Sequence, residues 1–247
     1  MLFRSDYAFL AMEFVDGMPL TKWAEQQQEG LSSRLQLVIA LCAALSAAHQ
    51  RGVIHRDLKP ENVLVRIIDG RPQPCVLDFG IARIGADLAQ ATAESGRLYG
   101  SLDFMSPEQA AGLPTIDVRT DVYALGAIAY WLFCGVAPIG TSALTVAEAL
   151  QWIRTEQPMP LRQRDPRLSA DLEAVIAKAL ASNPEDRYAS VRELAADLQA
   201  VLDHRPVTTR PLSMGYQLRC FARRQRALCA AIATAAAAVV LAVGLGV

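Results

Sequence analysis

The sequence predicts an α+β domain that is mainly helical, followed by a basic segment and a membrane-spanning helix. Three observations lead to this fold class. The β-prone stretches are short and lie within the first 77 residues, apolar residues recur at helical spacing beyond Pro107, and residues 227–247 carry no charge. The chain of 247 residues has 25 acidic and 24 basic residues. This balance suits a globular protein and disfavours a nucleic-acid binder.

The N-terminal part is expected to contain a strand and two helices. Residues 7–15 (YAFLAMEFV) are apolar and β-prone, and they end at the turn signal Asp16-Gly17. Residues 20–28 predict a short helix. Residues 33–50 predict a long helix, because apolar side chains recur on one face, namely Leu35, Val38, Ile39, Cys42, Leu45 and Ala48.

A hairpin and a long loop are expected next. Residues 63–65 and 76–77 predict two short strands, and Asp69-Gly70 between them suits a tight hairpin turn. Residues 81–105 show no periodic pattern and are rich in Ala, Gly, Ser and Thr. Because a loop of this length inside a compact domain is usually functional, we expect this segment to take part in activity.

The sequence beyond Pro107 predicts helices. Residues 122–133 are apolar nearly all round, which is typical of a buried central helix. Residues 171–180 carry a single apolar stripe. Ser190 and Glu193 have the spacing of a capping box, which predicts the start of a helix that runs to about Leu202.

Charge is distributed unevenly toward the C-terminal end. No acidic residue follows Asp203, whereas six arginines lie between residues 205 and 226. As a helix, the uncharged residues 227–247 would extend about 31 Å, close to the roughly 30 Å hydrocarbon core of a bilayer. An alanine-rich buried helix is the alternative. The arginines on the N-terminal flank favour a single-pass membrane helix and place the preceding domain in the cytoplasm.

We therefore expect three parts in the chain. A domain covers residues 1–204, a basic juxtamembrane segment covers residues 205–226, and a transmembrane helix covers residues 227–247. The expected location is the inner (cytoplasmic) membrane. The five cysteines show no metal-binding spacing, which indicates small buried residues in a reducing compartment.

Three motifs point to a chemical activity. They are HRDLKPEN at residues 55–62, DFG at residues 78–80 and SPE at residues 106–108. Phosphoryl transfer needs a carboxylate that accepts the proton of the attacking hydroxyl, a cation that balances phosphoryl charge, and oxygen ligands for magnesium. The side chains that fit these roles, in order, are Asp57, Lys59, Asn62 and Asp78.

With these motifs, residues 7–203 resemble the catalytic domain of bacterial eukaryotic-like serine/threonine protein kinases of the membrane-anchored type. The resemblance implies the protein-kinase fold, here mainly its α-helical C-terminal lobe. It also implies that Asp57 is the catalytic base and that Lys59 is the partner of the γ-phosphate. Asn62 and Asp78 are the implied magnesium ligands. A lysine at position 59 fits a serine/threonine kinase better than a tyrosine kinase.

The resemblance also implies a nucleotide site. Met12, Glu13 and Val15 resemble the hinge, in which the Glu13 carbonyl and the Val15 amide bond adenine and Met12 is the gatekeeper. Leu64 is the implied apolar floor under adenine. Taken alone, these hinge residues are an ordinary strand end, and only their register with the HRDLKPEN motif favours a binding role.

The activation segment is implied in the same way. Arg56 resembles the arginine that receives a phosphate from this segment. Thr92 and Ser95 are the candidate phosphate carriers. Ser101 lies where the family has a threonine that contacts the base and the substrate site.

Further residues are assigned structural roles. Glu108 and Arg187 resemble the buried ion pair that anchors the end of the activation segment. Asp121 resembles the carboxylate that caps the backbone of the catalytic loop. His55 and Phe79 resemble residues that stack in the core and align the two motifs.

One part of the family pattern is missing from the sequence. It contains no glycine-rich loop and no strand lysine with a helical glutamate partner, and Lys22 lies after the hinge. We therefore expect a fragment, or a mis-started reading frame, of a longer receptor-like kinase, with low activity of its own. A degenerate pseudokinase is the alternative.

The expected function is ATP- and Mg²⁺-dependent transfer of phosphate to serine or threonine of proteins in transmembrane signalling. The expected partners are ATP, protein substrates, a membrane and a second copy of the chain. Two other classes stay open, a non-catalytic scaffold and a small-molecule phosphotransferase. The SPE motif and the long activation segment argue against the latter, because together they build a platform for a peptide substrate.

Overall fold

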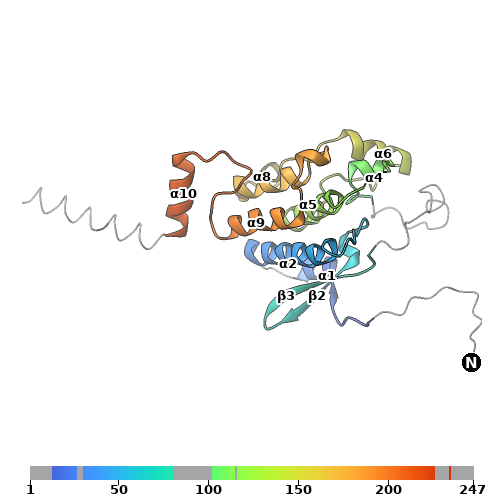
Figure 1. Ribbon diagram of the computed structural model, residues 1–247, viewed down its shortest axis with the longest axis horizontal. Helices are drawn as coiled ribbons and strands as arrows, with labels where there is room; N and C mark the ends of the chain where they lie inside the picture. Colours follow the sequence, from blue (N-terminus) through green and yellow to red (C-terminus); the bar gives the residue numbers. More distant parts are fainter. Residues whose placement is uncertain (1–12, 27–29, 80–101, 115, 226–233, 235–247) are drawn as a thin grey trace, which may run out of the picture.

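The computed structural model describes residues 13–26, 30–79, 102–114, 116–225 and 234 (Figure 1). Its strands are β1 (Met18–Pro19), β2 (Val63–Ile68) and β3 (Arg71–Val76). Its helices are α1 (Leu20–Gln26), α2 (Leu31–His49), α4 (Pro107–Ala110), α5 (Arg119–Cys134), α6 (Val146–Thr155), α7 (Leu161–Arg164), α8 (Ala170–Ala179), α9 (Val191–Leu202) and α10 (Met214–Arg224). Short 3-10 turns lie at Pro60–Asn62 and Pro184–Asp186.

The strands form a small antiparallel sheet in the order β1-β2-β3. The predicted hairpin is confirmed. Asp69 and Gly70 both have positive φ, 51° and 72°, as a tight primed turn requires. β3 begins at Arg71, five residues earlier than predicted, because Pro72 and Pro74 obscure its sequence signal. Prolines are tolerated there because β3 is the outer strand of this sheet.

The predicted first strand is only partly within the described residues. Residues 7–12 lie outside them, and residues 13–15 are not in a strand. The side chain of Phe14 is 88% exposed. Met18 and Pro19 pair with Val65 and Leu64, so the chain joins the sheet only after Gly17. No turn is assigned at Asp16 and Gly17, where the sequence predicted one.

Helices α2 and α5 form the centre of the molecule. α2 packs against α5, α9 and β3, and α5 packs against α8 (Figure 1). All but three of the sixteen residues of α5 are buried, as predicted for a central helix. At Gly126 an added Cβ would lie 2.9 Å from the Cβ of Ala179, so the close approach of α5 and α8 depends on this glycine.

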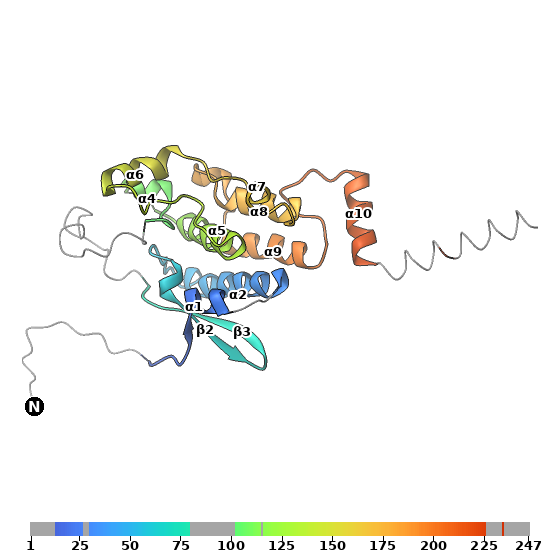
Figure 2. The same cartoon turned by 180° about the vertical axis from the view of Figure 1, so that it is seen from behind.

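Both views show the same arrangement of layers around α2. The hairpin and α1 lie on one side of α2, whereas α5, α8 and α9 lie on the other (Figures 1 and 2). α4 and α6 lie beyond α5, and α10 stands at the end of the domain near α9. The HRDLKPEN motif at residues 55–62 connects α2 to β2, and its 3-10 turn packs against α1 and β1.

The cap of α9 follows the prediction with one difference. The Ser190 hydroxyl accepts a hydrogen bond from the Glu193 amide at 3.3 Å, as in a capping box. The Glu193 carboxylate accepts from the Ala189 amide at 3.2 Å. In a standard box it would accept from the amide of Ser190 itself.

By length and composition, one helix in the described part of the chain could cross a membrane, namely α2. Its buried side chains form part of the domain core, which accounts for its apolar character. The segment for which we expect a membrane span, residues 227–247, lies outside the described residues except for Thr234.

Candidate active site

The backbone of the HRDLKPEN loop, residues 55–62, is bonded to the buried carboxylate of Asp121. Asp121, in the first turn of α5, is fully buried and accepts three hydrogen bonds. Its Oδ2 accepts from the His55 amide at 2.8 Å and from Nε2 of His49 at 2.7 Å. Its Oδ1 accepts from the Arg56 amide at 2.9 Å. The structure therefore places Asp121 beneath two successive backbone amides of the loop.

Arg56 has a backbone conformation that a non-glycine residue rarely adopts, with φ at 65°. Such a residue costs about 1–3 kcal/mol and persists only where its surroundings fix it. Its amide is bonded to Asp121, and its carbonyl accepts from Nε2 of Gln109 at 2.5 Å. These two bonds hold the turn that presents the next residue, Asp57.

Asp57, Lys59 and Asn62 meet at one carboxylate oxygen. Lys59 Nζ lies 3.1 Å from Asp57 Oδ2, and Asn62 Nδ2 lies 3.4 Å from the same atom. Asn62 Nδ2 also donates to the Asp57 carbonyl at 2.8 Å. The Asp57 side chain is 28% exposed and that of Lys59 is 20% exposed. Both groups are therefore fixed by neighbours and still reachable from solvent.

The DFG motif is connected to the HRDLKPEN loop through Leu77, the residue that precedes the motif. The Leu77 amide donates to the Asn62 carbonyl at 2.8 Å, and Nε2 of buried His55 bonds to the Leu77 carbonyl at 2.9 Å. The ring centroids of His55 and Phe79 lie 4.9 Å apart. Asp78 is exposed and has φ at 50°. These contacts hold the backbone on both sides of Asp78 against the loop that carries Asn62.

The chain that follows the predicted hinge lies near Leu64, the predicted adenine floor. Glu13 is exposed, Val15 is half-buried, and Met12 lies outside the described residues. At Gly17 an added Cβ would come 3.1 Å from the Cβ of Leu64. The chain that follows the hinge therefore passes directly over half-buried Leu64.

Glu108 and Arg187 form a buried ion pair. Their two parallel hydrogen bonds are both 2.7 Å, and the side chains are 5% and 0% exposed. The remaining N–H groups of Arg187 donate to the carbonyls of Ala181, Arg119 and Ser182. Burial opposes ionisation of Glu108, but its hydrogen bonds and attraction to Arg187 are stronger and lower its pKa below 4.5.

The side chain of Arg56 has an unused donor. Its Nε is buried without a hydrogen-bond partner among the described residues. A small space next to it is lined by Asp57, Met105 and Thr120, with Gln109 and others. Thr92, Ser95 and Ser101, the predicted residues of the activation segment, lie outside the described residues.

Two residues of this network were missed by the sequence analysis. His49 bonds to Asp121, and Gln109 bonds to Arg56. His49 lies four residues after Leu45 on the buried face of α2, so helical periodicity is a signal that could have found it. Gln109 follows the SPE motif, and only the tertiary structure brings it to the catalytic loop.

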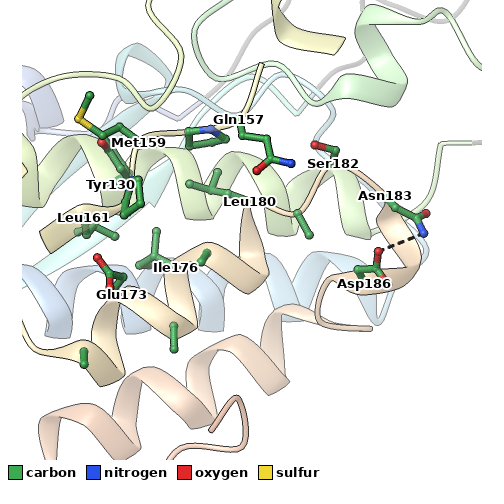
Figure 3. Close-up of a pocket in the computed structure, with 16 residues that line it drawn as sticks. Tyr130, Gln157, Met159, Leu161, Glu173, Ile176, Leu180, Ser182, Asn183 and Asp186 are labelled. Atoms are coloured by element: carbon green, nitrogen blue, oxygen red, sulfur yellow. Dashed lines mark hydrogen bonds between the residues drawn. The ribbon is translucent and has the colours of Figure 1, made fainter. Parts of the chain in front are cut away.

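A larger cavity lies away from these residues. It has a volume of about 690 Å³ and is bounded by α5, α7, α8 and the segments around Pro158 and Asn183 (Figure 3). Its lining is mainly apolar, and at one end Asn183 bonds to Asp186 at 3.3 Å. None of the catalytic-motif residues lines it, so it is separate from the candidate active site.

The sequence matches the protein kinase domain family over residues 1–204, and the chain belongs to that family. Its relatives include bacterial serine/threonine-protein kinases. PknB of Mycobacterium tuberculosis is 40% identical over 199 residues, which cover 80% of this chain and 31% of PknB. Pkn1 of Myxococcus xanthus is 41% identical over 209 residues, which cover 84% of this chain and 29% of Pkn1. The chain thus spans about a third of the length of the curated relatives that it matches.

A solved structure confirms the predicted fold class. The crystal structure of the Mycobacterium tuberculosis PknI kinase domain, as a double mutant, is 32% identical to the chain with a TM-score of 0.59. The match covers 77% of this chain and 65% of that one. The predicted protein-kinase fold, mainly in its helical lobe, is therefore confirmed.

Proposed function

We propose that the chain carries the catalytic half of a serine/threonine protein kinase and that Asp57 is its base. The observation that carries this proposal is the meeting of Lys59 Nζ and Asn62 Nδ2 at Asp57 Oδ2, at 3.1 and 3.4 Å. Asp57 would accept the proton of a substrate hydroxyl through its carboxylate. Lys59 is close enough to neutralise negative charge that develops beside that carboxylate.

The oxygen atoms present fit magnesium. Asn62 donates through its amide nitrogen to Asp57, which leaves its amide oxygen as a ligand, and Asp78 offers an exposed carboxylate. Mg²⁺ is usually bound by one or two such groups together with phosphate oxygens. Among the described residues no cluster of three His, Cys, Asp or Glu side chains could hold a metal alone. Asn62 and Asp78 would therefore hold Mg²⁺ jointly with ATP.

The adenine end of the site is supported by the close approach of Gly17, two residues after the proposed hinge, to Leu64. Backbone groups at Glu13 and Val15 suit adenine because its edge presents a donor beside an acceptor, and we keep Met12 as the proposed gatekeeper. Bound ATP supplies the phosphoryl group, and the described residues orient the substrate hydroxyl and take up its proton.

Regulation through the activation segment is the next part of the proposal. The buried Nε of Arg56 has no partner among the described residues, and a phosphate is a strong acceptor for a guanidinium group. Phosphorylation of Thr92 or Ser95 would supply such an acceptor. Ser101 would contact Asp57 and the substrate.

We also propose the domain division and location that the sequence predicts. Residues 1–204 form the kinase part, residues 205–226 a basic juxtamembrane segment, and residues 227–247 a span of the inner membrane. The support for a cytoplasmic kinase domain is the arginine excess before an uncharged segment. A role in transmembrane signalling follows from this arrangement.

The proposed activity can be tested with the chain joined behind the small lobe of Mycobacterium tuberculosis PknB. We expect transfer of the γ-phosphate of ATP to serine and threonine peptides. Asp57→Asn should lower the transfer rate by about 10²–10⁴, the usual contribution of a general base, with ATP affinity nearly unchanged. Asp69→Asn is a matched control, because this exposed hairpin residue lies in a turn that asparagine tolerates. ATP binding without any Asp57-dependent transfer would instead indicate a pseudokinase.

A further inference from the structure

Helix α10 presents an exposed apolar stripe. Met214, Leu218 and Phe221 are 84%, 68% and 41% exposed, and Leu212 just before the helix is 67% exposed. The spacing of four and three residues places the three helical side chains on one face. Within the described part of the chain this stripe is left open to solvent.

The opposite face of α10 is fixed to the domain. The Tyr216 hydroxyl accepts a hydrogen bond from the Val207 amide at 3.1 Å, and Cys220 is buried. The Arg210 guanidinium lies 4.8 Å from the Tyr216 ring centroid and bonds to Asp171 at 2.6 Å. These contacts set the rotation of α10. Its apolar stripe borders an open hollow of about 350 Å³ that is also lined by His204 and Pro206, and its side chains stay exposed.

The exposed part of α10 is strongly basic. Arg219, Arg223 and Arg224 are exposed, and the Arg224 guanidinium lies 5.9 Å from the ring centroid of Phe221. No acidic residue follows Asp203 in the sequence. A helix with an apolar stripe and several arginines has the character of helices that lie in the interface of an anionic membrane.

We propose that α10 lies on the surface of an anionic bilayer, with Met214, Leu218 and Phe221 in the interface and the arginines among the lipid headgroups. Two residues separate Arg224 from the uncharged segment 227–247, a path of at most about 11 Å. Where that segment spans the membrane, the C-terminal end of α10 lies close to the membrane surface. The inference extends the proposed location, although lipid contact by α10 requires only the anionic surface.

Contact by α10 is measured with the full chain carrying Leu218→Trp in vesicles whose acyl chains are brominated. Tryptophan fluorescence should be quenched in phosphatidylglycerol vesicles and much less in phosphatidylcholine vesicles, each read against the parent chain. Changing Arg219, Arg223 and Arg224 to glutamine should weaken contact about 100-fold, because each arginine near an anionic surface contributes a factor of about five.

Matched control variants test whether the quenching is specific to the apolar stripe and the arginines of α10. Leu113→Trp replaces another exposed leucine, 49% exposed and close to α4 at the far side of the domain, and should show no quenching. Glutamine at three exposed arginines outside α10 should leave the Leu218→Trp signal unchanged, the three being Arg154, Arg162 and Arg192.

Alkaline extraction of the same vesicles tests the membrane span separately. A chain that resists extraction but shows no quenching of Leu218→Trp would overturn the α10 proposal and keep the span. A self-association in detergent that Leu218→Asp abolishes would then identify a second copy as the occupant. Equal quenching in both lipids would also overturn the α10 proposal, because tethering by the membrane span alone would then explain the contact. An extractable chain that is quenched on phosphatidylglycerol would support α10 and refute the span.

Discussion

Removal of Arg187 should be among the most destabilising single changes in this domain. Arg187→Met keeps much of the aliphatic stem but leaves the Glu108 carboxylate, 5% exposed, without its cation. It also removes the donors to the carbonyls of Ala181, Arg119 and Ser182. Breaking a buried ion pair by removing one partner costs about 3–5 kcal/mol, against a total stability of about 5–15 kcal/mol for a domain.

The loss should be measurable by thermal and urea unfolding followed by circular dichroism. For a domain of this size, 3–5 kcal/mol corresponds to a fall in Tm of about 6–20 °C. Combining Arg187→Met with Glu108→Leu should recover part of the loss, because the second change removes the uncompensated charge. The three carbonyls stay without their donor in both proteins, so recovery should be incomplete.

The pH dependence provides an independent check of the same pair. In the parent chain the pKa of Glu108 is lowered, so its stabilisation is present above pH 4.5 and is lost as the pH falls through the lowered pKa. Without Arg187, burial should raise the pKa of Glu108. The loss of unfolding free energy caused by Arg187→Met should therefore be smallest at acidic pH, where Glu108 is protonated in the folded variant. The stability difference should therefore shrink as the pH falls from 7 toward 4.5. A difference below 1 kcal/mol at pH 7, or one that grows on acidification, would refute this reasoning.

Three more outcomes are expected. In the chain joined to a small lobe, Asp78→Asn should weaken magnesium-dependent ATP binding, measured by calorimetry with and without Mg²⁺, whereas a profile identical to that of Asp57→Asn would contradict the division of roles. Gly126→Ala should cost about 1–3 kcal/mol of unfolding free energy, because the new Cβ meets Ala179 at 2.9 Å, whereas Gly215→Ala in α10 meets nothing within 4 Å and should not destabilise. A reporter active only after export should work when fused after Val247 and stay silent after His204, and reversed activities would exclude the proposed topology.

Much of the helical lobe could be predicted from the sequence because its periodicity is strong. The all-apolar run at residues 122–133 can only be buried, and α5 is buried on nearly every side. The hairpin turn was predictable because Asp-Gly favours positive φ at both positions. β3 was shortened in the prediction because proline usually argues against a strand, and only its outer position in the sheet explains why two are tolerated.

The candidate site was predictable to a different extent. Its residues came from a resemblance in local motifs, which fixes residue types but not the contacts between distant segments. The bonds of His49 to Asp121 and of Gln109 to Arg56 join residues 72 and 53 positions apart. Local patterns carry no information on such pairs. The basic character of residues 205–226 was evident from the sequence, but the formation of α10 and the hydrogen bond from the Val207 amide to the Tyr216 hydroxyl were not expected.

The network around Asp121 explains how the proposed catalytic groups can keep their geometry before a nucleotide binds. Arg56 and Asp78 both have positive φ, and each such residue costs about 1–3 kcal/mol. The bonds from Asp121 and Gln109 fix Arg56, while the Leu77 and His55 contacts fix the chain beside Asp78. Asp121 is buried in α5 and also bonds to the amide of buried His55, so both sets are linked to the core through this carboxylate. The strain at the active site is therefore offset by the core, so substitutions at Asp121 should reduce stability and phosphoryl transfer together, whereas substitutions at Asp57 should affect transfer alone.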